Sequence, residues 1–343
     1  VWTNDRHDLE YVESMIDQYN QSNSDGIIIN LSVITEDYQN MLALAYNGGT
    51  APDVVTANSL PLNTFADTGI LVPLNEYIDA DATFQKVNEP YEHAYEGLNL
   101  RNGNIYGVYS GMRSGVRVEY NKDVVEAAGY KEIPAKLEDY INMAKTITEQ
   151  GGGSCYGIGF TSSSPFERLL EMSAQVSGIY YYDYVNGRYD FSGYKEILEL
   201  GQRFISEDIA YPDQQAVDNM RALFAEGQFA LWSNASQEAS VFTDQIPVKD
   251  FEWGVAPVPS ITGEIKGALQ TTPSKSWGIV SSSENKEQAW KVIQYFQSEA
   301  FIKGYLENGY CLPISTYMDG VIDKSKIGRL ADFSMLEYES VYP

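Results

Sequence analysis

The sequence predicts an α/β protein folded as two lobes, each a sheet flanked by helices. Short apolar segments of strand type alternate with amphipathic segments of helix type along most of the chain. The length of 343 residues is too great for one small core, so two lobes are the expected organisation. After residue 250 the pattern changes to extended, proline-punctuated segments, which we expect to cross between the lobes.

The N-terminal part of the chain carries a strand–helix–strand–helix–strand order. After a first strand that opens the chain, residues 9–19 have apolar side chains at helical spacing and residues 27–33 form a β-rich run. Residues 38–45 form a second amphipathic helix, and residues 52–56 read as a short buried strand. This order is typical of a sheet covered by helices on both faces.

The middle of the chain repeats the alternation of predicted strands and helices, and the end of the chain departs from it. The predicted strands are 116–120, 156–160 and 229–232. The predicted helices are 137–147, 166–177, 194–205 and 214–226. Beyond them we expect an extended segment at 253–259, a strand at 277–280, a helix at 289–296 and an extended connector at 311–314. We assign residues 1–110 and 256–312 to lobe 1, and 111–255 and 313–343 to lobe 2.

The composition excludes several classes of function. Lys and Arg number 23 and Asp and Glu number 48, a formal charge of −25, which repels nucleic-acid phosphates and anionic lipid surfaces. No apolar run approaches the roughly 20 residues that a membrane span needs. Two scattered histidines, His7 and His93, exclude a His-rich metal site, so we expect neither metal nor cofactor. Cys155 and Cys311 are expected to be free thiols, with a single disulfide as the alternative.

Several short motifs follow one another in a characteristic order. The most specific is IYGV at 105–108 followed by EYNKD at 119–123. The others are APDV at 51–54, FAEGQFAL at 224–231, GVAPVP at 254–259, WGI at 277–279, SENKEQAW at 283–290 and YLENGY at 305–310. By their order and spacing the chain resembles the extracellular solute-binding proteins of ABC importers, specifically the maltose-binding-like, carbohydrate-binding group.

The resemblance implies a two-lobed, periplasmic-binding-protein-like (type II) fold joined by extended hinge crossings. It implies a monomer that captures a sugar or oligosaccharide by hinge closure and delivers it to the membrane permease of an ABC importer. Such proteins act outside the cytoplasmic membrane, as surface lipoproteins in Gram-positive bacteria, which the acidity favours, or in the periplasm. Relatives carry further helices after a segment like 336–343, so we expect C-terminal helices of lobe 2 to be missing from this sequence.

Sugars present hydroxyl groups around apolar C–H faces, so proteins hold them with polar planar side chains and stacked aromatic rings. In the resembling family the loop after the first strand contacts ligand, and here it holds Asn4, Asp5 and Arg6. The loop after the third strand holds Asn58 and Ser59. Helix capping and solvated charge are the alternative roles for both loops.

The first crossing and the turn after strand 156–160 supply further candidates. Arg113 and Ser114 occupy positions that face ligand in relatives, and Arg113 can donate to several hydroxyls, with an interlobe ion pair as the alternative. Phe166 follows Ser164, which replaces the acid usual in some relatives. Phe166 is expected to stack on a sugar or to be a core aromatic.

Three more candidates lie in the second half of the chain. Trp232 and Gln237 follow the strand 229–232, with a core role as the alternative for Trp232. Trp277, which begins a strand, is a candidate for stacking. The tyrosine-rich run 180–184 is either an aromatic platform or, more simply, a solvent-facing loop with packed tyrosines.

Two other functions remain open from the sequence. A protein of the same fold could bind a polyamine, a peptide or an anion, and the many acids and aromatics would suit a polyamine. A glycosidase with paired carboxylates is the enzymatic alternative. The sequence holds no G-x-S-x-G, H-E-x-x-H or P-loop motif, and a binding protein is the favoured interpretation.

Overall fold

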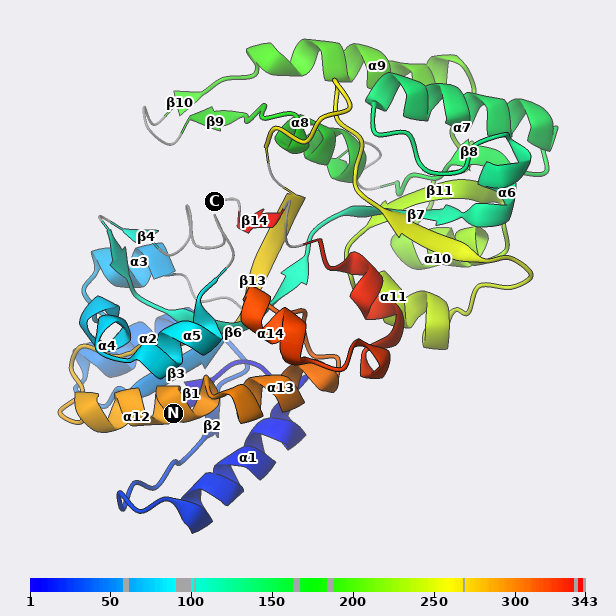
Figure 1. The fold of residues 1–343 in the computed structure, drawn as a ribbon. Coiled ribbons are helices and arrows are strands. Elements are labelled where there is room, and N and C mark those ends of the chain that lie inside the picture. Colours follow the sequence, from blue (N-terminus) through cyan, green and yellow to red (C-terminus); the bar gives the residue numbers. More distant parts are fainter. Residues whose placement is uncertain are drawn as a thin grey trace. The chain divides into compact units, whose positions relative to one another are not determined.

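A computed structural model describes residues 1–57, 62–90, 100–101, 103–162, 167–183, 188–267, 269–335 and 339–341. The chain divides into two compact units. The first unit comprises Val1–Arg113, Thr271–Gly328 and Ser340–Pro343, and the second comprises Ser114–Gln270 and Arg329–Glu339. Each unit has its own sheet flanked by helices, which confirms the predicted α/β class with two lobes (Figure 1).

The first unit is built on a sheet in which β1 lies between β2 and β3. Its strands are β1 (Trp2–Thr3), β2 (Ser32–Val33), β3 (Val54–Ala57), β6 (Val108–Ser114), β13 (Leu269–Ile279) and β14 (Glu339–Val341), beside a small hairpin of β4 (Leu100–Arg101) and β5 (Asn104–Ile105). β1 pairs in parallel with β2 and β3, and β13 runs antiparallel to β3 and also pairs with β6. Because β1 and β3 run in the same direction, their carboxyl ends meet at one edge of the sheet.

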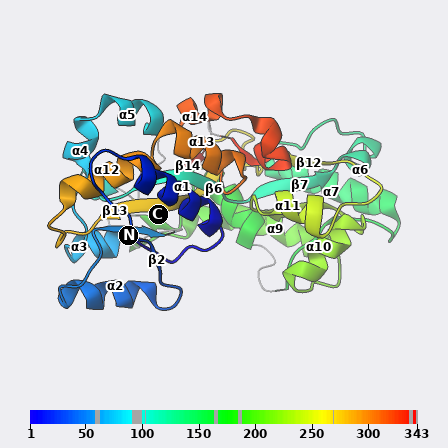
Figure 2. The same cartoon turned by 90° about the horizontal axis from the view of Figure 1, so that it is seen from below.

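Helices cover both faces of this sheet. They are α1 (Leu9–Ser22), α2 (Tyr38–Asn47), α3 (Leu62–Asp67), α4 (Asn75–Asp79), α5 (Ala82–Asn88), α12 (Lys286–Phe296), α13 (Glu299–Glu307) and α14 (Thr316–Val321). Figure 2 shows α2 and α12 on opposite sides of β13. The Tyr38 hydroxyl on α2 donates to the carbonyls of Trp2 and Thr56, while Phe296 on α12 stacks on Trp277 with ring centroids 4.2 Å apart.

The β-rich run 27–33 forms a strand only at its end, which differs from the prediction. Two asparagines of α1 and its C-terminus hold the backbone of this segment instead of a neighbouring strand. Asn20 accepts from the Ile29 amide at 2.8 Å and donates to its carbonyl at 3.0 Å. Asn23 makes the corresponding pair with Ile27, at 3.2 and 2.9 Å. Side-chain amides can replace a β ladder in this way because they carry the same donor and acceptor as the backbone.

The second unit contains a sheet with the strand order β12-β7-β11-β8. Its strands are β7 (Arg117–Asn121), β8 (Tyr156–Ile158), β11 (Phe229–Asn234) and β12 (Trp253–Ala256), with a separate hairpin of β9 (Tyr182–Asp183) and β10 (Arg188–Tyr189). β11 is parallel to β8 and antiparallel to β7. The carboxyl ends of β8 and β11 therefore lie at the same edge, together with the start of β7.

Figure 1 shows α7 and α10 on opposite sides of this second sheet. The helices are α6 (Lys122–Ala127), α7 (Leu137–Gly151), α8 (Met172–Val176), α9 (Lys195–Ser206), α10 (Val217–Ala225) and α11 (Glu238–Ser240). The apolar stripe of α7, including Tyr140 and Ile141, packs with Val118, Ile158 and Leu231 of the strands in one buried core. Among the described residues no helix is both long enough and apolar enough to span a membrane.

The unit boundaries differ from the predicted lobes in two longer segments, 256–270 and 313–328, and in two short ones, 111–113 and 340–343, which are predicted in lobe 2 and belong to the first unit. Residues 256–270, predicted in lobe 1, belong to the second unit, because β12 pairs with β7 and the backbone of Ser260 bonds that of Ala135 and Leu137. Residues 313–328, predicted in lobe 2, belong to the first unit, where Ser315 donates to the Val87 carbonyl at 2.8 Å. In both longer segments hydrogen bonds to residues distant in the chain, which the local sequence pattern does not reveal, accompany the assignment to the unit.

Both cysteines are free thiols, as predicted. Cys155 lies half-buried in the second unit and Cys311 is buried in the first. Burial raises the pKa of the Cys155 thiol to about 11 and that of Cys311 to about 12. Neither thiol is therefore activated as a nucleophile or metal ligand.

Candidate functional site

The loop that follows β1 places polar side chains at the carboxyl edge of the first unit's sheet. Asn4 and Arg6 are exposed there, whereas Asp5 and Asp8 are buried. The Asp5 amide donates to the Thr3 hydroxyl at 3.1 Å, which turns the chain as the strand ends. Exposed and buried polar side chains therefore alternate in this loop. The exposed ones can contact a ligand, and the buried ones hold the loop in place.

Lys275 occupies the space between the two buried acids. Its ammonium lies 2.9 Å from the Asp8 carboxylate and 3.8 Å from that of Asp5, and all three side chains are almost fully buried. Lys275 precedes Ser276, which is paired with Ala57 at the end of β3, so β13 brings it to the same edge as the β1 loop. Its backbone is left-handed, with φ of 54°, a conformation costly for a residue other than glycine.

His7 connects this buried cluster to the surface. Its Nδ1 contacts Asp5 Oδ1 at very short range, and a carboxylate can only accept, so Nδ1 carries the proton. Nε2 is then left to accept from Arg113 Nη2 at 3.3 Å. Burial by itself favours the neutral form of Asp5, but the His7 hydrogen bond and the Lys275 charge hold the pKa of Asp5 below its ordinary value. An ionised Asp5 thus orients His7, and His7 in turn orients an exposed arginine.

The ligand atoms of Asp5, His7 and Asp8 lie within 4.8 Å of one another, close enough to hold a cation. The Lys275 ammonium already supplies a positive charge to both carboxylates. The arrangement is therefore complete as an ion-pair cluster, whose chemical capacity is to fix hydrogen-bonding groups rather than to bind a metal.

Arg113 is placed by a tight approach of two segments. It lies on β6, where Met112 exchanges backbone hydrogen bonds of 2.9 and 2.8 Å with Leu312. A Cβ on Gly111 would come within 2.8 Å of both the Cys311 sulfur and the Leu312 carbonyl oxygen. Glycine is therefore required there for the close packing that holds the Arg113 backbone.

Trp277 lies in the core of the first unit. Its ring is fully buried, it stacks on Phe296 at an interplanar angle of 13°, and its Nε1 donates to the Ser110 hydroxyl at 2.9 Å. This placement favours a packing role for Trp277 over the predicted stacking on a ligand.

The second unit has its own polar group at the carboxyl end of β11. Gln237 is exposed, and its side-chain nitrogen donates to Asn234 Oδ1 at 3.0 Å, which also accepts from the Ala235 amide. Asn234 itself is buried, so the exposed amide of Gln237 is held by a fixed partner. This geometry suits recognition of a hydroxyl by the remaining atoms of the Gln237 amide.

Buried charges lie behind that group. Arg221 holds Glu238 with three contacts of 2.7 to 3.1 Å, and Glu119 Oε2 accepts from the Asn234 amide at 3.1 Å. Burial, and then the nearby Glu238 charge, raise the pKa of Glu119 well above its ordinary value. Glu119 consequently keeps its proton to a higher pH than an exposed glutamate does.

Two other predicted residues of the second unit, Trp232 and Ser114, are buried. Trp232 is packed against Phe229 with ring centroids 5.9 Å apart, which favours the core role. Its Nε1 has no hydrogen-bond partner among the residues that the structure describes. Ser114 is also buried and donates to the Gly115 carbonyl at 3.3 Å. The predicted contacts Asn58, Ser59 and Phe166 lie outside the described residues.

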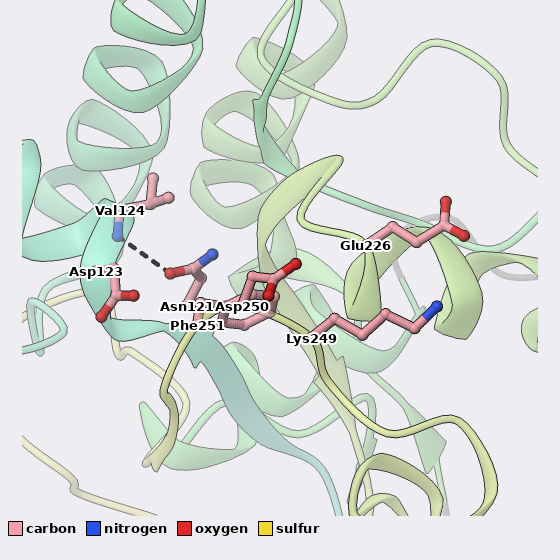
Figure 3. A pocket seen from close by; sticks show the side chains of 7 residues that line it. All are labelled: Asn121, Asp123, Val124, Glu226, Lys249, Asp250 and Phe251. Atoms are coloured by element: carbon pink, nitrogen blue, oxygen red, sulfur yellow. Dashed lines mark hydrogen bonds between the residues drawn. The ribbon is translucent and has the colours of Figure 1, made fainter.

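A shallow cavity of about 370 Å³ lies at the opposite end of β7 in the second unit (Figure 3). It is lined by Asn121, Asp123, Val124, Glu226, Lys249, Asp250 and Phe251. Asn121 Oδ1 accepts from the Val124 amide at 3.1 Å and so caps α6. The polar groups of this cavity thus include a helix cap, and the cavity lies away from the strand edge that carries Gln237.

Sequence reasoning did not select three residues that organise the first unit's site, namely His7, Asp8 and Lys275. The lysine follows a run of Thr, Pro and Ser that resembles an exposed loop, and its burial depends on acids 267 or more positions earlier in the chain. The spacing of Asp5 and His7 at i and i+2 is the one local signal that could have been used.

Comparison with known proteins identifies the family. The family model of bacterial extracellular solute-binding proteins matches residues 4–303. A binding protein of Brucella abortus is 23% identical over 311 residues, covering 86% of this chain and 70% of the relative. The maltotriose-binding protein of Pyrococcus abyssi is 24% identical over 336 residues, covering 93% of this chain and 67% of the relative.

Among solved structures, the sugar-binding protein MalE from Xanthomonas citri matches with a TM-score of 0.83 and 20% identity, covering 100% of this chain and 86% of that protein. At that identity the match establishes the fold. The chain belongs to the family of bacterial extracellular solute-binding proteins, which the family model establishes across most of its length.

Proposed function

We propose that this member of the extracellular solute-binding family binds a sugar or oligosaccharide and delivers it to an ABC importer. The observation that carries the proposal is the row of exposed polar side chains at the strand edge of the first unit. Asn4, Arg6 and Arg113 offer amide and guanidinium groups there, and Arg113 is held by His7. Such groups match the hydroxyls of a neutral sugar.

The buried cluster supports this proposal through pre-organisation. A ligand that meets a fixed donor does not have to restrict a flexible arginine, which otherwise lowers affinity. Asp5, Lys275 and Asp8 contribute no exposed surface, so their role in the proposal is to position the outer groups. Gln237, held by Asn234, provides a comparable group in the second unit.

The remaining roles follow from the family. Solute-binding proteins act outside the cytoplasmic membrane, and we propose that this protein is a surface lipoprotein or a periplasmic protein that works as a monomer with a membrane permease. The names of the compared proteins, which include maltotriose-binding and sugar-binding proteins, support a carbohydrate as the ligand. Binding and release require no chemical step, so we assign no catalytic residue.

The test is a thermal-shift panel of mono- and oligosaccharides, polyamines and short peptides, followed by calorimetry on each ligand that raises the melting temperature. A ligand at 100 times its Kd stabilises the folded state by about 2.7 kcal/mol, which is readily measured. We expect Arg113→Ala to weaken sugar binding about tenfold to a hundredfold, because a charge-assisted hydrogen bond contributes ~1.5–3 kcal/mol.

A matched control is Lys291→Ala, which removes a cation of the same unit that pairs with Asp25 at 3.1 Å on the surface. It should leave the dissociation constant unchanged. Stabilisation by a polyamine or peptide and by no carbohydrate would show that the proposed ligand class is wrong. Release of reducing ends from an oligosaccharide would show that binding is not the whole activity.

A further inference from the structure

An aromatic platform lies on the hairpin between α8 and α9 in the second unit. It consists of Tyr181, Tyr189 and Phe191, and the side chains of the last two are 67% and 62% exposed. Figure 1 shows β9 and β10 leaving the body of this unit between those helices. Single exposed apolar residues are common on protein surfaces, but three adjacent aromatic rings form a patch that usually indicates a binding surface.

The three rings lie side by side and nearly parallel. The centroid separations are 6.2 Å for Tyr181–Tyr189, 6.2 Å for Tyr181–Phe191 and 6.1 Å for Tyr189–Phe191. The interplanar angles are 10°, 11° and 1°. Three parallel rings in a single column would place the outer two about twice as far apart as neighbours. The equal separations therefore exclude a single column of rings.

Hydrogen bonds hold the described backbone beside the platform. The Asp190 amide donates to the Tyr181 carbonyl at 2.8 Å, and the Ser192 amide donates to Asp190 Oδ1 at 2.9 Å. Phe191 also packs edge-on against Tyr194, whose amide donates to the Phe191 carbonyl at 3.0 Å. A pre-organised surface of this kind loses little conformational entropy when a ligand binds.

We propose that the platform binds pyranose rings of an oligosaccharide or polysaccharide face-on, through residues other than the strand-edge groups. A pyranose has an apolar C–H face that packs on an aromatic ring and a rim of hydroxyls that needs polar partners. Arg188 and Asp190 are exposed beside the rings, and Tyr181 and Tyr189 carry hydroxyls of their own. The net charge of −25 disfavours nucleobases carried on a phosphate chain, the other common partner of flat aromatic surfaces.

The experiment is native electrophoresis of the full chain in gels that contain a soluble neutral polysaccharide: amylopectin, mixed-linkage β-glucan, arabinoxylan or galactomannan. We expect at least one of them to retard the protein in proportion to its concentration. The double variant Tyr189→Ala/Phe191→Ala should raise the dissociation constant of the protein–polysaccharide complex, as measured from the retardation, about tenfold, because two ring contacts are lost. The control Ile205→Ala removes another exposed apolar side chain of the second unit, 50% exposed on α9, and should be retarded like the wild type.

Two further measurements separate this surface from the proposed transport function. Arg113→Ala should keep the retardation while weakening calorimetric binding of a short sugar, and the platform variant should lose retardation while keeping the calorimetric binding. Thermal unfolding of each variant verifies that it is folded. If no gel retards the wild type, or if the platform variant is retarded equally, the inference is overturned. A wild-type dimer that the platform variant converts to monomer, without any retardation, would also overturn it and assign the rings to self-association.

Discussion

Replacing Lys275 by methionine is expected to destabilise the first unit strongly. Methionine keeps an unbranched apolar stem of similar length but removes the ammonium that lies 2.9 Å from Asp8 and 3.8 Å from Asp5. The two carboxylates would then remain buried without their cation. Removing one partner of a buried ion pair typically costs about 3–5 kcal/mol, which is a large fraction of the ~5–15 kcal/mol that stabilises an ordinary domain.

The penalty should depend on pH in a defined direction. The pKa of Asp5 is held below its ordinary value in the native wild type, so Asp5 stabilises the fold above the unfolded pKa and loses this contribution as the pH falls through the folded one. Without the Lys275 charge, which helps to lower the pKa of Asp5, the native Asp5 binds a proton more readily. The difference in stability between wild type and Lys275→Met should therefore be largest near neutral pH and should shrink below about pH 4.

Urea unfolding followed by tryptophan fluorescence is a suitable assay, because Trp277 lies 5.9 Å from the Lys275 ammonium. A double variant, Asp8→Asn with Lys275→Met, should recover part of the loss, since it removes one of the two uncompensated charges. The control Lys291→Met breaks an exposed pair with Asp25 and should cost at most about 1 kcal/mol. A loss below ~1 kcal/mol for Lys275→Met, or strictly additive effects in the double variant, would refute the buried-cluster reasoning.

Three further outcomes are expected. Gly111→Ala should destabilise the folded protein by about 1–3 kcal/mol in thermal unfolding and weaken ligand binding in calorimetry. The methyl group of the alanine would lie 2.8 Å from the Leu312 oxygen, beside Arg113. An unchanged melting temperature would count against this close packing. Glu119→Gln should have the same free energy of unfolding as the wild type near pH 4 and one that is higher by about 1 kcal/mol or more at pH 8. The reason is that the pKa of Glu119 is raised in the native state, so the wild type loses stability as the pH rises above the unfolded pKa. An unchanged dependence of stability on pH would contradict this. Cys155, with a pKa of about 11, should be roughly one part in a thousand thiolate at pH 8, so iodoacetamide should label the native protein far more slowly than the urea-unfolded one, as mass spectrometry would show.

The sequence was sufficient for the elements whose signal is local. The apolar stripe of 137–147 became α7, and the short apolar run at 52–56 became β3, because helical and extended periodicities can be read without knowing the partner. The run 27–33 shows the limit of this reasoning. Its composition favours a strand, but the side chains of Asn20 and Asn23 make the backbone hydrogen bonds that a neighbouring strand would otherwise make. Propensity scales do not include such competition from side chains.

The candidate site divides in the same way. Asn4, Asp5, Arg6 and Arg113 were selectable because they follow strand ends or lie on a recognisable crossing motif. Lys275 was not, because its burial comes from a contact 267 residues away. The tryptophans were ambiguous for a related reason: whether a ring at a strand end faces the core or a ligand depends on which residues pack beside it, as Phe296 does against Trp277.

The buried cluster explains how specificity can arise at a strand edge that carries few groups. The His7 hydrogen bond and then the Lys275 charge keep Asp5 ionised, Asp5 fixes the proton of His7 on Nδ1, and His7 Nε2 accepts from Arg113. The pairing of Lys275 with Asp5 lies in a water-poor setting, where a hydrogen bond to a charge is stronger and an unmade one is more costly, whereas the His7–Arg113 hydrogen bond lies at the surface. Because Arg113 has a fixed direction, a ligand with a hydroxyl at the matching position gains a full hydrogen bond. An analogue that lacks this hydroxyl would cover the Arg113 guanidinium and leave its N–H group without a partner. Sites of this kind discriminate strongly against such an analogue.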